Sequence, residues 1–456
     1  ANMIFFTTGN GSITNFPFVP TIKLMSTTQR YQLVEHEMDI NAGRYLEGIA
    51  MAELSSEMLD HSVQVASGLR TKGEQAGHHQ VSIWRDWRQT GEENLRDLLQ
   101  ISETEGTALP IKPAQSVCNL TFEAIRSGES YLTDQIGLIL PTSLCSGQIA
   151  QMVTGHLNSK EHGKRALSRY VALVHTEGCG VSGGSSEALF SRTLMGYMTH
   201  PMVRLALALE HGCEKTHNDY IRHQLQLMEY TPEDFGWASV QLDGGIERVS
   251  QKVERWFEEN LQAADTVYET AGVKHLSLAV AASEPLSEQT GRGLSQVVRQ
   301  VVGAGGTVVV PYGGSLLSCP YFVAETLIGN EIKPTLPYGQ KAPSTGFFIM
   351  DTPTRHWVET LTGLGASGAG VMLAHVGSRP VQGHPMIPLI QVSSCEEIKK
   401  GFEQDLDLIL EGNPGGWSQE MLKLICAVAS RVYVPRLQVQ GNTDFQLTRG
   451  LLGVSM

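Results

Sequence analysis

The sequence has no long apolar run and little positive charge. None of its apolar stretches approaches the roughly 18 residues that a membrane-spanning helix requires. Its 34 Lys and Arg residues are outnumbered by 47 Asp and Glu residues, which gives a formal net charge of −13 at pH 7. Phosphate backbones and anionic lipids repel such a chain, so we expect neither nucleic acid nor a membrane as a partner.

Cysteine is also scarce. The chain of 456 residues has seven cysteines, an odd number, and they are dispersed along its length. Disulfide-rich proteins are usually short and carry an even number of cysteines at close spacing. The pattern is therefore typical of a protein with free thiols in a reducing compartment, and we predict a cytoplasmic location.

The remaining composition, with 41% apolar and 18% charged residues, is typical of a globular protein. From residue 136 onward, short apolar runs alternate with helical patterns, an arrangement that favours parallel strands joined by helices. We predict an α/β fold with doubly wound, Rossmann-like parallel sheets. The predicted strands are residues 136–140, 170–174, 202–209, 238–242, 275–281, 307–310, 346–350, 371–374 and 386–392.

The opening of the chain recurs near its end. The segment FPFVPTIKL aligns with HPMIPLIQV, so that Pro17 and Pro20 meet Pro385 and Pro388. Asp39 then meets Asp407, and after a short slip residues 55–59 meet 418–422. Common ancestry explains these matches, although two unrelated strand–helix units with similar packing demands are the alternative.

A duplication predicts how the chain is organised. Residues 1–70 are the tail of a first copy, 71–128 connect, and 129–267 and 268–456 are the two α/β domains of a second copy. We therefore expect the chain to be part of a longer protein. Packing against the rest of the first copy, or a homo-oligomer, are the protein contacts that this organisation allows.

Groups able to ligate a metal follow four successive predicted strands. Because the carboxyl ends of parallel strands share one edge of a sheet, these side chains should converge. Thiolates, imidazoles and carboxylates together suit a divalent transition metal. The alternative is that each cysteine is a small buried apolar residue and each histidine is merely hydrogen-bonded. The groups, in strand order, are Cys145; His175, Glu177 and Cys179; Glu210, His211, Cys213 and Glu214; and Asp243.

A glycine pattern follows the second of these strands. Gly178, Gly180 and Gly183 satisfy the spacing G-x-G-x-x-G, which binds dinucleotides and can equally hold a carboxylate or phosphate. No acidic residue ends a strand about 20 positions later, as a nicotinamide site requires. A nicotinamide oxidoreductase is therefore kept only as a rival hypothesis.

Several phrases resemble motifs of the altronate and galactarate dehydratase family. They are LPTSLCSG, HTEGCG, HGCE, GGTVVVPYGG and MDTP, together with the opening ANMIFFTTGNGSITNFPFVPTIKL and the segment EMDINAGRYLEG. The resemblance covers residues 1–50 and roughly 125–395. It implies elimination of water from a hydroxylated sugar acid, giving a 2-keto-3-deoxy acid, with a divalent metal, Fe²⁺ or Mn²⁺. The implied metal ligands are Cys145, His175, Cys179 and Cys213, and the implied acid or base groups are His211, Glu177 and Asp243.

The second copy departs from this family in three places. Residues 127–135 lack the usual Asp-Gly-Arg and Arg-Asn stretch, and residues 280–284 read Val-Ala-Ala-Ser-Glu where a Cys-Gly-Gly-Ser-Asp phrase is usual. A Gly-Asn-Lys phrase is also missing near residues 340–343. Loss of a thiolate and a guanidinium would weaken a metal site and a carboxylate site together. The alternative function is thus a catalytically degenerate second copy that serves as a structural or ligand-binding module.

Overall fold

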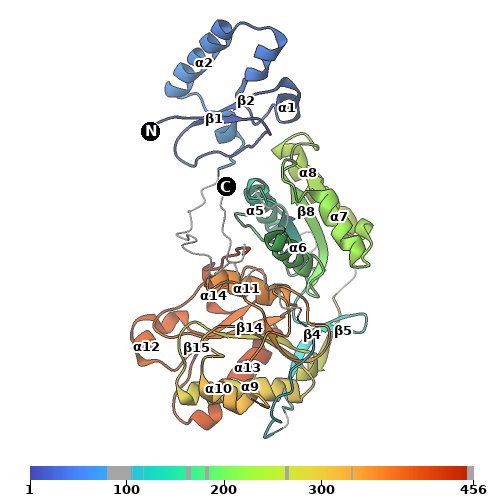
Figure 1. The fold of residues 1–456 in the computed structure, drawn as a ribbon, viewed down its shortest axis with the longest axis vertical. Helices are drawn as coiled ribbons and strands as arrows, with labels where there is room; N and C mark the ends of the chain where they lie inside the picture. Colours follow the sequence, from blue (N-terminus) through green and yellow to red (C-terminus); the bar gives the residue numbers. More distant parts are fainter. Residues whose placement is uncertain are drawn as a thin grey trace.

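A computed structural model describes residues 1–79, 104, 106–116, 118–160, 166–179, 184–261, 266–329 and 332–448. Figure 1 shows three parts along the long axis: an N-terminal unit (residues 1–79), a middle domain (136–261) and a C-terminal domain (266–448). Parallel sheets with flanking helices confirm the predicted α/β class. Within the described residues, none of the helices has both the length and the apolar composition to cross a membrane.

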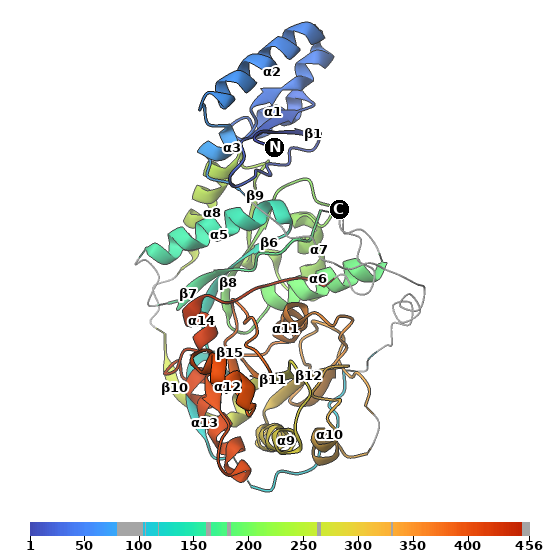
Figure 2. The ribbon, with the colours of Figure 1, turned by 90° about the vertical axis from the view of Figure 1, so that its left-hand side faces the viewer.

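The N-terminal unit contains a small parallel sheet. Strands β1 (Ile4–Thr8), β2 (Thr21–Met25) and β3 (Ile40–Asn41) lie in that order, and β2 is buried along its whole length. The helices of the unit are α1 (Thr28–Leu33), a 3-10 helix (Ala42–Glu47), α2 (Met51–Ala66) and α3 (Lys72–Gln75). In Figure 2, α2 lies on the far side of the unit from the middle domain.

The middle domain has a four-stranded parallel sheet in the order β7-β6-β8-β9. Alternate residues of its strands point to opposite faces, so each face has its own core. One face packs with α5, α8 and the N-terminal unit, and the other packs with α6, α7 and the C-terminal domain. The elements are β6 (Ile136–Pro141), α5 (Leu144–Ser159), β7 (Arg169–Ala172), α6 (Gly184–Met198), β8 (Val203–Glu210), α7 (Asn218–Leu227), a 3-10 helix (Pro232–Asp234), β9 (Gly236–Ser239) and α8 (Ile246–Asn260).

The C-terminal domain has a six-stranded parallel sheet in the order β13-β12-β11-β14-β15-β16. In chain order this is 3-2-1-4-5-6, the doubly wound topology that places ligands at the carboxyl edge of the sheet. Its strands are β11 (Ser277–Ala282), β12 (Thr307–Pro311), β13 (Gly346–Met350), β14 (Val371–His375), β15 (Leu389–Ser393) and β16 (Leu408–Ile409). Its α-helices are α9 (Glu288–Gly303), α10 (Pro320–Thr326), α11 (Trp357–Ala366), α12 (Glu396–Phe402), α13 (Trp417–Ala429) and α14 (Arg436–Gln440). Its 3-10 helices are Val273–His275, Glu403–Asp405 and Pro414–Gly416.

An antiparallel sheet that the sequence did not predict joins the two domains. Strands β10 (Tyr268–Gly272), β4 (Thr121–Ser127) and β5 (Ser130–Leu132) pair in that order, with Tyr268 opposite Ile125. The sheet combines one strand from the predicted connecting segment with one strand from each predicted domain. The predicted domain boundaries near residues 128 and 267 stay a prediction. Residues 80–103 of the predicted connecting segment lie outside the described part of the chain.

Candidate active site

Three cysteines gather at the carboxyl edge of the middle sheet. Cys145 is buried in the first turn of α5, directly after β6. A hydrogen bond from the Cys179 thiol, aided by the nearby His211, lowers the pKa of Cys145 to about 6. The same hydrogen bond raises the pKa of Cys179. Burial and the charge of Cys145 raise the pKa of Cys213 to about 12. The structure thus brings together three of the four predicted metal ligands.

A tight turn after β8 presents His211 and Cys213. The Glu214 carboxylate accepts main-chain N–H groups from His211 at 2.8 Å, Gly212 at 2.7 Å and Cys213 at 2.9 Å. It also accepts the Thr142 hydroxyl at 2.7 Å. Burial raises the pKa of Glu214, but these hydrogen bonds outweigh burial and lower it overall. Glu214 therefore holds the turn in shape.

His211 lies with the three cysteines, and these four residues are called the thiol site below. Its Nδ1 lies 3.2 Å from Cys213 Sγ, and its buried Nε2 has no hydrogen-bond partner among the described residues. Ligand atoms of His211, Cys213 and Glu214 lie within 4.8 Å of one another. Thiols with an unpartnered imidazole are a donor set that fits a divalent transition metal.

His175 does not join this group. Its Nε2–H donates to the Pro141 carbonyl at 2.8 Å, and its Nδ1 accepts the Glu177 main-chain N–H at 3.1 Å. Burial lowers its pKa to about 4, so the ring is neutral. The role of His175 as a metal ligand stays a prediction, which these contacts do not favour because both ring nitrogens have main-chain partners.

The two predicted carboxylates are held by other partners. Glu177 is buried, and its Oε1 accepts the Thr176 hydroxyl at 3.1 Å and the Gln446 amide at 3.2 Å. Asp243 accepts the Ser239 main-chain N–H at 2.8 Å and forms an ion pair with Lys252 at 2.8 Å. Asp243 is thus committed to the turn before α8.

Gly178 explains part of the glycine pattern. Its backbone is left-handed, with φ of 108°, and a Cβ there would fall 2.2 Å from the Thr142 carbonyl oxygen. The position thus requires glycine for close packing of two loops. Gly180 and Gly183 lie outside the described residues, so the dinucleotide hypothesis gains no support from the structure.

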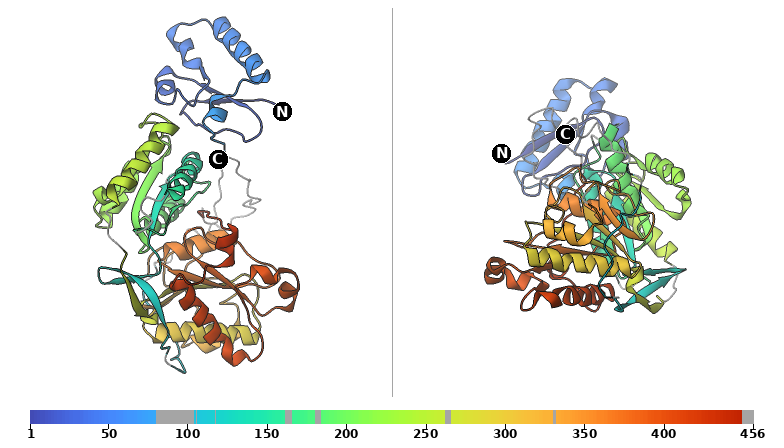
Figure 3. Two further views of the ribbon diagram at one scale, coloured as in Figure 1. Left: turned by 180° about the vertical axis from the view of Figure 1, so that it is seen from behind. Right: turned by 60° about the horizontal axis from the view of Figure 1, so that its bottom comes forward.

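The N-terminal unit adds residues that the sequence did not assign to this site. Figure 3 shows the unit resting on α5 and α8 of the middle domain. From the loop after β1, Ser12 Oγ lies 3.6 Å and Thr14 Oγ1 lies 4.0 Å from Cys145 Sγ. Arg30 donates to Gln241 Oε1 at 2.8 Å across the same contact. The family-like phrase TTGNGS was the only sequence signal, and it did not reveal this contact.

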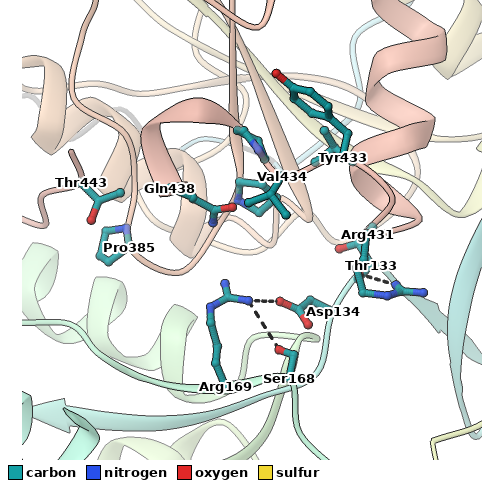
Figure 4. A pocket seen from close by; sticks show the side chains of 13 residues that line it. Thr133, Asp134, Ser168, Arg169, Pro385, Arg431, Tyr433, Val434, Gln438 and Thr443 are labelled. Carbon is teal, nitrogen blue, oxygen red and sulfur yellow. Dashed lines mark hydrogen bonds and ion pairs between the residues drawn. The ribbon is translucent and has the colours of Figure 1, made fainter. Parts of the chain in front are cut away.

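A separate hollow of about 500 Å³ lies between the middle and C-terminal domains. Figure 4 shows Arg169 beside Asp134 and Ser168, and Arg431 beside Thr133. Arg169 also donates to the Met386 carbonyl at 2.7 Å, and Arg431 donates to the Thr133 carbonyl at 2.7 Å. Both guanidinium groups therefore serve domain contacts, unlike His211 of the thiol site.

Comparisons with known proteins agree with the motifs. Residues 1–89 and 328–450 match the family described as D-galactarate/Altronate dehydratase, C-terminal. Residues 135–265 match D-galactarate dehydratase/Altronate hydrolase, second domain. Altronate dehydratase of Escherichia coli (strain K12) is similar, with 31% identity over 84 residues that cover 18% of this chain and 17% of that protein.

Proposed function

This chain belongs to the galactarate and altronate dehydratase family, and from that premise we propose that it acts on a sugar acid at the thiol site of the middle domain. The reaction is elimination of water to give a 2-keto-3-deoxy acid. One observation carries the proposal: Cys145, Cys179, Cys213 and His211 converge at the carboxyl edge of one parallel sheet. That sheet lies in the segment that matches the second domain of the family.

The residues of the thiol site have distinct roles in metal binding and proton transfer. Cys145, Cys179 and Cys213 would hold Fe²⁺ or Mn²⁺, which when bound polarises the substrate carboxylate and favours loss of the adjacent proton. His211, oriented through Nδ1 by Cys213, presents its unpartnered Nε2 for proton transfer. Glu214 keeps both residues in place through its three main-chain hydrogen bonds.

Turnover by the chain with added iron(II) tests the proposal. Galactarate and altronate are supplied, and formation of the keto acid is measured. We expect Cys213→Ala to lower activity by about 10- to 100-fold, because loss of a ligand or its support weakens metal binding on that scale. Cys395→Ala removes a half-buried thiol of the C-terminal domain and should leave activity unchanged. If neither galactarate nor altronate gives a keto acid, the dehydration proposal is wrong.

The degenerate-copy alternative draws on the C-terminal domain. The buried end of β11 carries alanines and no thiol where the family usually has one. This alternative predicts that the chain binds sugar acids without producing keto acid, so the same assay separates the two functions.

We also propose that the N-terminal unit and residues 371–440 arose by duplication. Their strand registers support this, since Ile4 pairs with Thr21 as the aligned Met372 pairs with Leu389. Matches to the same family description at residues 1–89 and 328–450 support it as well. The second of these units is called the C-terminal counterpart below.

The two aligned aspartates support the duplication most directly. Asp39 Oδ2 accepts the Lys23 main-chain N–H at 2.8 Å, and Asp407 Oδ2 accepts that of Gln391 at 2.7 Å. Their Oδ1 atoms accept the first main-chain N–H of α3 and of α14, each at 2.9 Å. Such matched detail is difficult to explain by shared packing patterns alone.

A further inference from the structure

The N-terminal unit buries several polar side-chain atoms that make no hydrogen bond among the described residues. Three of these side chains are Asn15 through Oδ1, Lys23 through Nζ, and His78, whose ring nitrogens lie near the main chain of Cys145 and Ile13 without good hydrogen-bond geometry. Asn15, Lys23 and His78 are 2%, 0% and 1% exposed, respectively. The other such atoms of the unit are Thr27 Oγ1, Glu37 Oε2 and His61 Nε2. A buried ammonium without a partner is costly, so a folded protein keeps one only for a reason beyond packing.

The three side chains lie close to one another and to the thiol site. A Cβ at Gly73 of α3 would fall 2.4 Å from Lys23 Nζ and 2.8 Å from Asn15 Oδ1, so both groups rest against this glycine. Burial, and next the charge of Lys23, lower the pKa of His78 to about 4, and His211 acts in the same direction. His78 thus lies near Lys23 and near the main chain of Cys145, and Thr14, the neighbour of Asn15, has its Oγ1 4.0 Å from Cys145 Sγ.

Neighbouring carboxylates do not neutralise Lys23. Burial lowers its pKa to about 8, although Asp39 and Glu37 oppose this. Both Asp39 oxygens accept main-chain N–H groups, and Glu37 Oε1 accepts the Ile246 N–H at 2.7 Å, while Glu37 Oε2 has no hydrogen-bond partner among the described residues. Among the described residues, Lys23 Nζ therefore has neither an ion pair nor a hydrogen bond.

The C-terminal counterpart shows that the fold does not need this polar group. Lys23 aligns with Gln391, whose Oε1 accepts the Val381 N–H at 2.8 Å and whose Nε2 donates to the Asp405 carbonyl at 3.2 Å. Gly73, the second residue of α3, corresponds to Leu437, the second residue of α14, which is buried in the main apolar core. In the counterpart, an apolar side chain and a hydrogen-bonded amide thus occupy the positions that hold unpartnered polar groups in the N-terminal unit.

We propose that Lys23, Asn15 and His78 bind a carboxylate group of the sugar acid whose reacting carbons lie at the adjoining thiol site. This inference rests on the proposed function and adds a substrate-binding role for the N-terminal unit. The Lys23 ammonium supplies the charge, and the His78 ring supplies an N–H donor. The Asn15 side chain offers an amide N–H₂ or accepts a hydroxyl. A carboxylate in this position would accept hydrogen bonds from Lys23 and His78, and a neighbouring hydroxyl of the sugar acid would donate one to Asn15 Oδ1.

Calorimetric titration of the full chain tests this binding role. The probes are galactarate and galactitol, which has the same carbon chain but no carboxylate. Two variants copy the C-terminal domain: Lys23→Gln copies Gln391, and His78→Asn copies Asn442, whose main-chain N–H donates to Leu437 as that of His78 donates to Gly73. We expect each to weaken galactarate binding by about 10- to 100-fold, the scale of a lost charge-assisted hydrogen bond. Lys399→Gln, at a surface ion pair of the C-terminal domain, should not alter binding.

The outcomes separate the binding role from a structural one and from catalysis. Unchanged galactarate affinity in both folded variants would overturn the inference, even if their melting temperatures shift. Failure of the wild type to bind galactarate, or equal binding of galactitol, would overturn it too. Weaker binding in Lys23→Gln without any keto-acid product would uphold the carboxylate site and reject only the dehydration proposal.

Discussion

The N-terminal unit and its C-terminal counterpart share a main-chain design but not an interior. In both, an aspartate links the central strand to the following short helix through its two oxygens. Around Asp407 the Gln391 amide is hydrogen-bonded, and the Tyr433 hydroxyl donates to Asp407 Oδ1 at 2.9 Å. Around Asp39 the interior holds the unpartnered Lys23. Main-chain hydrogen bonding therefore sets this fold, while the side chains inside it are free to serve a ligand.

The two units also differ in what covers them. Leu59 of α2 is 66% exposed, whereas the aligned Leu422 of α13 is fully buried. Helix α13 packs against α9 and β4 of the C-terminal domain. Figure 1 shows α2 at the outer end of the molecule, away from the helices of the middle and C-terminal domains. The same sequence pattern is thus a core element in one setting and a surface in the other.

Gln391→Lys should have the largest effect, because it places the lysine of the first unit into the closed interior of the second. The new ammonium would be buried without a partner, and both Gln391 hydrogen bonds would be lost. We expect a loss of about 5 kcal/mol in the free energy of unfolding, measured with urea. Lys23→Gln should cost far less. Equal costs would mean that the two interiors are not as different as their contacts indicate.

Asp407→Ala should cost nearly as much. It leaves the Gln391 and Arg436 main-chain N–H groups and the Tyr433 hydroxyl without an acceptor, for a loss of about 4 kcal/mol. Asp39→Ala should act on the first unit alone. Hydrogen exchange read by mass spectrometry should show faster exchange in β15 for the first variant and in β2 for the second. Faster exchange in both strands from either change would show that the units unfold together.

Leu422→Ala and Leu59→Ala compare the two helices at aligned positions. Truncation of buried Leu422 leaves a cavity and should cost about 3 kcal/mol. Truncation of exposed Leu59 should change stability by less than about 0.5 kcal/mol. Urea denaturation monitored by circular dichroism measures both. A large loss from Leu59→Ala would reveal that another chain or segment covers α2 in solution.

The strands that the sequence predicts well are the buried parallel ones. The predicted strand 346–350 coincides with β13, and 136–140 differs from β6 by one residue. A strand covered on both faces is a continuous apolar run, which is visible without any partner. Strand β4 is half exposed and pairs with β10, about 140 positions away, so no local pattern identified it.

The site was predictable only where one sheet determines it. Strand ends placed Cys145, Cys179 and Cys213 together, because parallel strands share a carboxyl edge. His175 follows the same rule, but main-chain partners occupy its nitrogens. Lys23 could not be assigned from sequence, since its place beside the thiol site depends on how two separate units pack.

His384 gives a smaller, pH-dependent contrast between the units, because the aligned residue of the first unit is Phe16. Its Nδ1 accepts the Met386 N–H at 3.1 Å, and its Nε2–H donates to the Tyr197 hydroxyl oxygen at 2.8 Å. Burial lowers its pKa to about 3. Below about pH 6.5 the unfolded chain therefore binds a proton that the folded chain does not, and stability falls as the pH falls.

We expect this ring to cost about 2 kcal/mol of stability between pH 7 and pH 5, at about 1.4 kcal/mol per pH unit below pH 6.5. His384→Phe copies the first unit and cannot take up the proton. Urea denaturation at both pH values should show a smaller loss in this variant than in the wild type, even if the variant is less stable at pH 7. Equal losses in the two proteins would mean that His384 is protonated in the folded state, and that its hydrogen bonds to Met386 and Tyr197 do not hold it neutral.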